Sequence, residues 1–308
     1  MQENLESYLN AARRGSDWLV DHQGPDGLIT SMEACYKSAY ALAVSGRFVE
    51  ANLLVSYIKN NALMPNGDFG NQMWRIYKNA WIVQGAHRIG RFDVSMPGMS
   101  YILNAQAPCG GFCGTDDTNQ MVECVYTAWS GLAAVYLGQM DVAKKAGDCF
   151  LEMLKQQPDK MKLYFNMSPD GKLLTDSGFI DATLTKQIYY NPGIVMLFFM
   201  RLYIATLDKR YLSGAQQLFE FSLCCAEDAY QSPPSGKSGL GAAIMYSVTG
   251  DERARDKAIE LADYLVGFQH PGGSWGFTPE DPLDVLTDIT GEFTVFLTEI
   301  AATLASVK

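Results

Sequence analysis

This chain of 308 residues contains few histidines and no long hydrophobic run. Its three histidines, His22, His87 and His270, form no paired ligand motif, so the sequence predicts no metal site, and nothing in it indicates another cofactor. The longest apolar stretch, residues 193–207, is interrupted by Arg201 and is too short to span a bilayer. No basic segment followed by an apolar one stands at the beginning, so we expect no secretion signal.

Basic side chains are outnumbered by acidic ones. The 24 Lys and Arg residues against 34 Asp and Glu residues give a formal net charge of -10, which argues against nucleic acid or an anionic membrane as a partner. We therefore expect a small-molecule partner, and whether the chain forms a homo-oligomer is left open. The seven cysteines are an odd number, so we expect no complete disulfide framework and a cytoplasmic location. With 48% apolar residues, the chain should bury a large core.

The tripeptide Pro-x-Gly recurs six times, and all copies but the fifth carry a large apolar residue two positions after the glycine. The copies begin at Pro25, Pro65, Pro108, Pro169, Pro234 and Pro271. Proline fixes φ and glycine permits φ > 0, so we interpret each copy as a turn. A second series of turns alternates with the first, at Gly46-Arg47, Gly90-Arg91, Gly138-Gln139, Asp208-Lys209 and Gly250-Asp251.

Between the turns lie twelve segments of helical length and period. They span residues 4–22, 30–45, 48–61, 72–89, 92–105, 117–137, 140–157, 182–206, 209–228, 238–249, 252–268 and 285–306. Every second segment is apolar on all sides, whereas the others carry a charged face. We therefore predict an all-α protein, an (α/α)6 toroid in which six helical hairpins form an inner and an outer ring, as a single domain over residues 1–308. An open superhelix of hairpins has the same local signals.

Three of the turns carry a glutamine two residues before the proline, at Gln23, Gln106 and Gln269. The sequence Gln269-His-Pro-Gly-Gly273-Ser-Trp275 resembles the Gln-x3-Gly-x-Trp repeat of the squalene-hopene cyclase and protein prenyltransferase β-subunit toroids, and the other two look like weaker copies. The resemblance to this terpenoid cyclase and prenyltransferase superfamily implies an α/α toroid. It says less about the reaction, because one fold supports many functions.

The sequence Gly114-Thr115-Asp116-Asp117-Thr118 stands where the third inner helix is expected to begin. It resembles the Asp-x-Asp-Asp-Thr motif of class II terpenoid cyclases, although the first aspartate is absent. The resemblance implies that Asp116 or Asp117 is a catalytic acid that protonates an alkene or an epoxide. Two adjacent carboxylates beside aromatic side chains can raise one pKa through desolvation and repulsion. Alternatively, the pair caps the helix and stabilises its dipole.

Charged side chains also interrupt the apolar inner segments. An unpaired charge at Glu292 would be costly, so we expect a partner such as Lys37 or Lys78, or a catalytic role. The dipeptides Tyr36-Lys37 and Tyr77-Lys78 recur on the first two inner segments, where they either form ion pairs with carboxylates or donate to a substrate oxygen. Further carboxylates expected at the same end of the hairpins are Glu33, Glu123, Asp176, Asp181 and Asp288.

Aromatic side chains are concentrated on the inner segments and in the loops. Besides Tyr36 and Tyr77, we expect substrate contacts from Trp74, Phe112, Tyr126, Tyr189, Trp275 and Phe277, although each of these can instead belong to the core. Such rings suit either carbocation stabilisation or stacking on sugars. Cys113 is expected near the same site, either as a reactive thiol or as a small buried residue.

These observations leave three functions open. The leading hypothesis is a metal-independent acid–base enzyme, a terpenoid or polyene cyclase or isomerase acting on a small hydrophobic substrate, with Asp116, Asp117 and Glu292 as catalytic residues. The first alternative is a carbohydrate-active six-hairpin enzyme, a hydrolase, lyase or epimerase, whose carboxylates act as acid and base. The second alternative is a binding toroid without catalysis.

Overall fold

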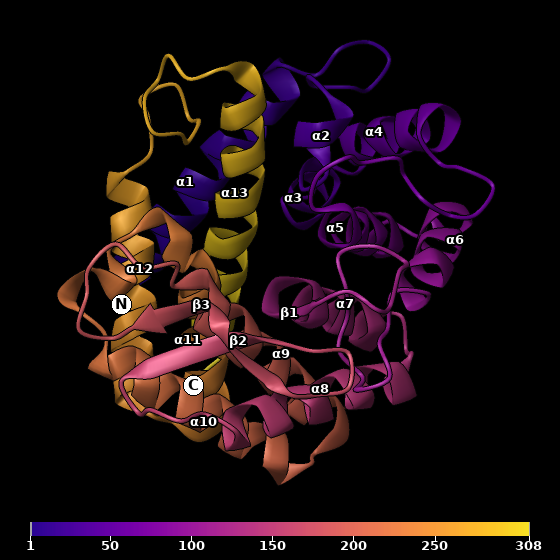
Figure 1. Cartoon of the computed structure of the whole chain (residues 1–308). Coiled ribbons are helices and arrows are strands. Elements are labelled where there is room, and N and C mark those ends of the chain that lie inside the picture. Colours follow the sequence, from indigo (N-terminus) through magenta and orange to yellow (C-terminus); the bar gives the residue numbers. More distant parts are fainter. Residues whose placement is uncertain (1, 308) are drawn as a thin grey trace. The chain divides into compact units, whose positions relative to one another are not determined.

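The computed structural model describes residues 2–307, which form mainly helices (Figure 1). The thirteen α-helices in this range are α1 (Gln2–Asp21), α2 (Met32–Cys35), α3 (Ser38–Val44), α4 (Phe48–Asn61), α5 (Arg75–Arg88), α6 (Phe92–Leu103), α7 (Cys124–Tyr136), α8 (Met140–Lys155), α9 (Tyr190–Thr206), α10 (Lys209–Cys224), α11 (Gly236–Thr249), α12 (Glu252–Gly267) and α13 (Leu283–Ala305). Two short 3-10 helices span Glu227–Tyr230 and Pro233–Ser235.

Each of the twelve predicted segments contains a helix, and the main differences lie at helix starts. The segment 30–45 is divided into α2 and α3 at Tyr36 and Lys37. Helix α7 begins at Cys124 rather than at residue 117, and α9 begins at Tyr190 rather than at residue 182. In front of these helices, the carboxylates of Asp117 and Asp181 accept hydrogen bonds from backbone N–H groups two residues further on. Such turns compete with helix formation, so both helices start late.

A small antiparallel sheet is absent from the predicted elements. Its strands β1 (Val122–Glu123), β2 (Lys162–Met167) and β3 (Leu173–Asp181) lie in the order β1-β2-β3. The fourth Pro-x-Gly turn, at Pro169, connects β2 to β3, where Ser168 N–H donates to the Lys172 carbonyl at 2.8 Å. This copy is therefore a β-hairpin turn rather than a connection between two helices.

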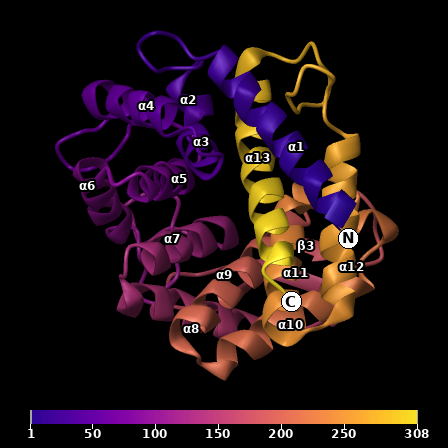
Figure 2. The ribbon, with the colours of Figure 1, turned by 180° about the vertical axis from the view of Figure 1, so that it is seen from behind.

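The contacts divide the chain into two compact units, residues 1–102 with 262–308 and residues 103–261. In the first unit, α13 packs against α1, α2 and α3, and α3 packs against α4 and α5. Figure 2 shows α1 alongside α13. In the second unit, α9 packs against α7, α10 and α11. The single-domain prediction for residues 1–308 stays a prediction.

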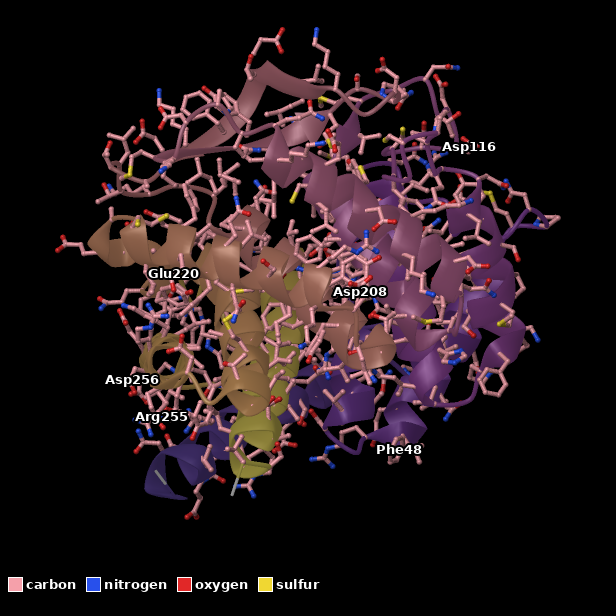
Figure 3. All side chains as sticks on the ribbon, turned by 90° about the horizontal axis from the view of Figure 1, so that it is seen from below. Phe48, Asp116, Asp208, Glu220, Arg255 and Asp256 are labelled. Carbon is pink, nitrogen blue, oxygen red and sulfur yellow. The ribbon has the colours of Figure 1, made fainter. Side chains whose placement is uncertain are left out.

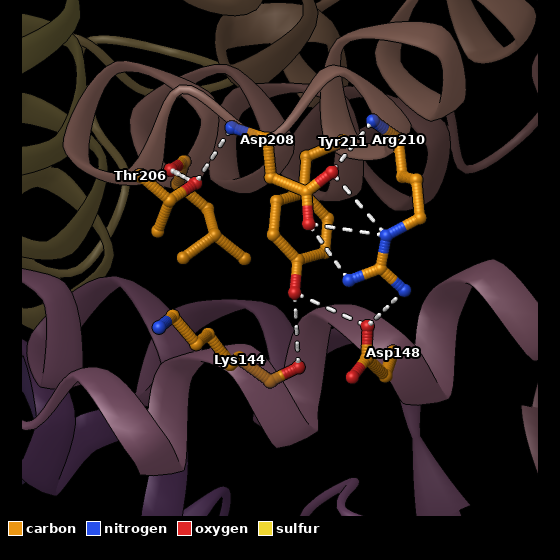
Figure 4. A network of polar contacts seen from close by, with 7 residues as sticks. Lys144, Asp148, Thr206, Asp208, Arg210 and Tyr211 are labelled. Carbon is orange, nitrogen blue, oxygen red and sulfur yellow. Dashed lines mark hydrogen bonds and ion pairs between the residues drawn. The ribbon is translucent and has the colours of Figure 1, made fainter.

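The helices are of two kinds, which confirms the difference predicted from their composition. Residues 76–86 of α5 and residues 124–134 of α7 are all buried. Helices α8 and α10 instead bury one face and carry charges on the other. Between them, Arg210 bonds to Asp208 at 2.7 Å and to Asp148 at 3.3 Å, while the Tyr211 hydroxyl donates to Asp148 at 3.1 Å (Figure 4). This network joins the exposed side chains of Arg210 and Asp148 to the buried Tyr211 and links α8 to α10.

The glutamines of the Pro-x-Gly turns bond to main-chain carbonyl groups. Gln106 Nε2 donates to the carbonyl of Gly110 at 2.9 Å and to that of Val142 on α8 at 3.2 Å. Gln23 and Gln269 make the same pair of bonds, to Gly27 and Glu50 and to Gly273 and Ala11. Each amide group thus fastens its turn to the backbone of another helix, to α8 from Gln106, to α4 from Gln23 and to α1 from Gln269. A satisfied backbone carbonyl can be buried at little cost.

The glycines of the two turn series differ in their surroundings. A β-carbon on Gly67, in a Pro-x-Gly turn, would lie 2.1 Å from the Pro97 carbonyl oxygen on α6, and its φ is 93°. Gly46, in the other series, has a similar φ of 76°, but a β-carbon there would meet nothing within 4 Å. The turn at Gly67 is therefore packed against helix backbone, as are those at Gly27, Gly110 and Gly273, whereas the turn at Gly46 is open.

Two further observations apply to the described chain. All seven cysteines are free thiols. No helix within residues 2–307 combines the length and the apolar composition that crossing a membrane would need.

Candidate active site

The side chain of Lys37 is the centre of a charged cluster in the first unit. The residue is 4% exposed, and its ammonium group forms ion pairs with Asp288, at 2.9 Å from Oδ1, and with Glu292. The ammonium nitrogen also lies 5.1 Å from the ring centroid of Tyr36 and 5.9 Å from that of Trp81, within cation–π range. The lysine partner expected for Glu292 is thus confirmed.

A second ion pair, between Lys78 and Glu33, contacts the same tyrosine ring. Lys78 Nζ lies 2.5 Å from Glu33 Oε2 and 5.1 Å from the ring centroid of Tyr36, and it donates to the Glu33 carbonyl at 2.8 Å. The other carboxylate oxygen of Glu33 accepts a hydrogen bond from the Gln72 backbone N–H at 2.6 Å. Because Tyr36 contacts both lysines, the two ion pairs form one cluster, called the Lys37 cluster below.

Aromatic rings extend the Lys37 cluster towards solvent. The Tyr77 ring packs edge-to-face against Tyr36, Trp81 and Trp74, with centroid distances of 6.1, 6.2 and 6.4 Å. Trp74 is 41% exposed, and its φ of 57° places a bulky residue in the left-handed region. Backbone strain of this kind, about 1–3 kcal/mol, is typical of ligand-binding sites. Trp74 therefore offers an accessible ring beside the ion pairs.

Burial and charge act in opposite directions on the groups of the Lys37 cluster. Burial alone would lower the pKa of Lys37, but Asp288 and Glu292 hold that pKa well above its usual value. Burial raises the pKa of Tyr36 well above its usual value. Burial also acts to raise the pKa of Glu33, but hydrogen bonds from Lys78 and Gln72 hold it below its usual value. At neutral pH the cluster therefore contains a charged lysine, an ionised Glu33 and a neutral phenol.

Helices α2, α5 and α13 and the break between α2 and α3 bring these groups together. Asp288 and Glu292 are four residues apart on α13 and so lie on one face of the helix. Both reach Lys37, which lies at the break between α2 and α3. Lys78, in the first turn of α5, reaches Glu33 on α2. The expectation that Lys37 and Lys78 form ion pairs with carboxylates is confirmed.

A smaller cluster lies at helix starts in the second unit. Glu123 precedes α7, and burial raises the pKa of its half-buried carboxyl above the usual value. In the described chain no cation or hydrogen-bond donor pairs with this carboxylate. Burial, Glu123 and Tyr190 together raise the pKa of Tyr126, and the Lys237 ammonium lies 5.7 Å from the Tyr190 ring centroid. The cluster therefore combines a protonatable carboxyl with two phenols and a lysine.

Asp116 and Asp117 are not at a helix start. They lie in an exposed loop, eight and seven residues before α7 begins, and Asp116 is at the surface in Figure 3. The Asp117 carboxylate accepts hydrogen bonds from the backbone and the side chain of Asn119 at 3.1 and 3.3 Å. The helix cap expected for this pair is not present, because the chain forms a turn here instead.

Several predicted substrate contacts belong to the core. Phe112, Cys113 and Trp275 are each 0% exposed, so they have no surface to offer a ligand. The Trp275 indole N–H donates to the Leu265 carbonyl at 2.8 Å. Tyr189 is 2% exposed, and its hydroxyl bonds to Asp228 at 2.6 Å. Phe277, in contrast, is 73% exposed in the loop before α13.

Sequence reasoning missed some members of these clusters. Lys237 follows the fifth Pro-x-Gly copy, which lacks the large apolar residue, and this difference was the available signal. Gln72 contributes only its backbone N–H, which no side-chain pattern could indicate.

No three His, Cys, Asp or Glu side chains within residues 2–307 are grouped so as to hold a metal ion. The absence of a cofactor stays a prediction.

No family model matches the chain, and no curated protein matches it in sequence. Solved structures do match over nearly its full length. A D-mannose isomerase, 11% identical, has a TM-score of 0.73 and covers 99% of this chain and 98% of its own. The alpha-1,6-mannanase of Salegentibacter sp. HEL1_6 has a TM-score of 0.67, 12% identity and coverage of 98% and 100%. An unsaturated glucuronyl hydrolase specific for heparin has a TM-score of 0.67, 10% identity and coverage of 99% and 97%.

These matches confirm the predicted α/α toroid, with the small sheet as an addition. They overturn the resemblance to terpenoid cyclases and prenyltransferases, and with it the cyclase hypothesis, because the matched proteins are carbohydrate-active enzymes. The physical reason lies in the motif itself. Gln269 and Trp275 bond to the backbone of neighbouring helices, so the pattern reports hairpin packing and carries no information about the reaction.

Proposed function

We propose that the chain is an enzyme acting on carbohydrates, and that the Lys37 cluster catalyses aldose–ketose isomerisation of a neutral sugar. The observation that carries the proposal is the Lys37 ammonium group shared by Asp288 and Glu292, beside the accessible ring of Trp74. The fold match to a D-mannose isomerase over 99% of the chain supports it.

The chemistry of this isomerisation needs a base and a fixed positive charge. The base removes a proton from the carbon next to the carbonyl, and the cation stabilises the enediolate oxygen. In our proposal Glu292 takes the proton from C2 and returns it to C1, while the O2 proton moves to O1. Lys37 holds the enediolate oxygen, and its raised pKa keeps it charged throughout.

The charges of the Lys37 cluster favour a neutral sugar. Three carboxylates, on Glu33, Asp288 and Glu292, face two ammonium groups, and each ammonium group already has a carboxylate partner. A sugar phosphate or a uronate would meet excess negative charge. The hydroxyl groups of a neutral sugar can instead bond to the carboxylates, and its apolar face can stack on Trp74.

The test uses D-mannose, D-glucose and D-fructose with the full chain in D2O, followed by NMR. We expect interconversion of an aldose and a ketose with deuterium incorporated at C1 or C2. Glu292→Gln should lower kcat by about 10²–10⁴-fold, the usual contribution of a general base. The control is Glu152→Gln, which removes the carboxylate of an exposed ion pair with Lys155 on α8. A folded protein that interconverts none of these three sugars would overturn the proposal.

A second candidate function is glycoside hydrolysis, which the state of Glu123 favours. Hydrolysis needs a protonated carboxyl to donate to the leaving oxygen. Burial raises the pKa of Glu123, whereas the pKa of Glu33 is held low. A variant of the matched alpha-1,6-mannanase with two consecutive aspartates changed to asparagine is inactive, and this chain has consecutive aspartates at Asp116 and Asp117.

Release of reducing sugar from an alpha-1,6-mannobiose separates the two candidates. Hydrolysis that is lost in Glu123→Gln, without any exchange of sugar protons, would replace the isomerase proposal. Isomerisation that persists in Asp116→Asn and Asp117→Asn would exclude these aspartates from the reaction.

A further inference from the structure

Two thiols of the second unit lie in contact where a loop meets a helix. The sulfur atoms of Cys109 and Cys149 are 3.7 Å apart. Cys109 is the middle residue of the third Pro-x-Gly turn and is partly exposed, whereas Cys149 lies on α8 and is 3% exposed. A disulfide bond has an S–S length of about 2.05 Å, so the gap to close is small.

The backbone holds both cysteines in place. Cys109 N–H donates to the Pro169 carbonyl in the fourth Pro-x-Gly turn at 3.0 Å. The turn that carries Cys109 is fastened to α8 by the bond from Gln106 to the Val142 carbonyl. A β-carbon at Gly111 would lie 2.9 Å from the Cys149 sulfur, so this glycine leaves room for that sulfur beside the turn. Thiols fixed at contact distance by packed backbone react as a preformed pair.

We propose that Cys109 and Cys149 are a redox-modification site, at which a small disulfide such as glutathione disulfide converts the two thiols into a reversible protein disulfide. The proposal does not depend on the sugar chemistry proposed above.

The oxidation takes place in two exchange steps. The Cys109 thiolate attacks one sulfur of glutathione disulfide, whose S–S bond breaks and releases one glutathione thiolate. Cys149 then attacks the Cys109 sulfur of the mixed disulfide, releases the second glutathione thiolate and gives up its proton to it. Two protein thiols are oxidised and one glutathione disulfide is reduced to two glutathione molecules.

The electrostatics assign the order of these steps. The contact with the Cys149 thiol lowers the pKa of Cys109 below its usual value, which favours the thiolate on the partly exposed residue. The same contact, together with burial, raises the pKa of Cys149. Cys109 is therefore the thiol that meets the oxidant, and Cys149 is the one that resolves the mixed disulfide. The new bond would link the loop before α7 covalently to α8.

The test incubates the reduced full chain with glutathione disulfide, blocks the remaining thiols with iodoacetamide and maps the tryptic peptides. We expect a dithiothreitol-sensitive link between the peptides 92–144 and 146–155, which carry Cys109 and Cys149. The native chain should form this link at least about tenfold faster than the chain unfolded in urea, because the thiols are pre-positioned. Cys113→Ser is the matched control, since Cys113 is in the same peptide and should leave the link intact.

The variant Cys149→Ser provides a second test of the proposal, which does not require detection of the linked peptides. It should trap glutathione on Cys109, with the fold verified by circular dichroism. The proposal fails if the native chain forms no link, if it links Cys109 to Cys113 instead, or if glutathione attaches only to the exposed Cys224.

Discussion

Glu33 on α2 and Lys78 on α5 form an ion pair in which Oε2 and Nζ are 2.5 Å apart. The pair joins the starts of two buried helices, and the remaining carboxylate oxygen is bonded to the Gln72 backbone. The Glu33 side chain is 40% exposed, so solvent screens the attraction. Its contribution to folding therefore depends on pH and remains modest.

The pH dependence of this contribution has a definite sign. Because the pKa of Glu33 is lowered from 4.5, its stabilisation is present above the unfolded-state pKa and is lost as the pH falls through the folded-state pKa. In urea titrations, the free energy of unfolding of the wild type should exceed that of Glu33→Gln by less than about 1 kcal/mol at pH 6. This difference should vanish near pH 3. A difference that grows as the pH falls would contradict the assignment.

Removing the Lys37 ammonium should destabilise the first unit strongly. Lys37→Met leaves the carboxylates of Asp288 and Glu292 without their cation, which costs about 3–5 kcal/mol when the broken pair is buried. The double variant Lys37→Met with Glu292→Gln should regain part of this loss, because one of the unpaired charges is removed. Lys155→Met, in an exposed ion pair, is the control and should stay within about 0.5 kcal/mol of wild type.

A comparison of Gly67→Ala with Gly46→Ala distinguishes the cost of backbone strain from the cost of a steric collision. Gly67→Ala should cost well over 2 kcal/mol in unfolding free energy, about twice or more the cost of Gly46→Ala, which we place at about 1 kcal/mol. Both positions have a positive φ, but only at Gly67 would the new methyl group collide with a neighbouring backbone. Equal losses in the two variants would show that the close contact with Pro97 relaxes freely.

Variants of two tryptophans distinguish a residue that stabilises the fold from one that contacts the ligand. Trp275→Phe should lower stability by about 1–3 kcal/mol through the lost hydrogen bond to Leu265, without changing KM for a sugar. Trp74→Ala should raise KM with little effect on stability, because the ring is 41% exposed. A change in KM confined to Trp275→Phe would contradict these roles, because it would make Trp275 rather than Trp74 the ligand contact.

The fold could be predicted because its signals are repeated and local. Twelve segments with helical periodicity, separated by proline and glycine turns, determine the hairpins without knowledge of distant contacts. The late start of α7 could not be seen in the same way. There the Asp117 side chain bonds to backbone that a helix would otherwise use, and this local competition depends on the geometry of a single turn.

The candidate site could be predicted in part, through the cost of burying charge. Glu292 in an apolar helix required a cation, and the structure supplies Lys37. The spacing of Asp288 and Glu292 reveals nothing about Glu33 or Tyr36, which come from a distant part of the chain. The reaction was misjudged because Gln269 and Trp275 form a motif that is visible in the sequence, yet both serve helix packing.

The packed Pro-x-Gly turns also determine where the loops of this chain can differ in length. After Gly27 the next helix begins at Met32, five residues on, whereas after Gly110 it begins at Cys124, fourteen residues on. Both glycines lie against helix backbone of their own unit, Gly27 near Leu53 on α4 and Gly110 near Lys145 on α8. Insertions beyond such a glycine lengthen the tip of a loop whose root stays fixed. The connections beyond these glycines can therefore differ in length while the helices keep their places.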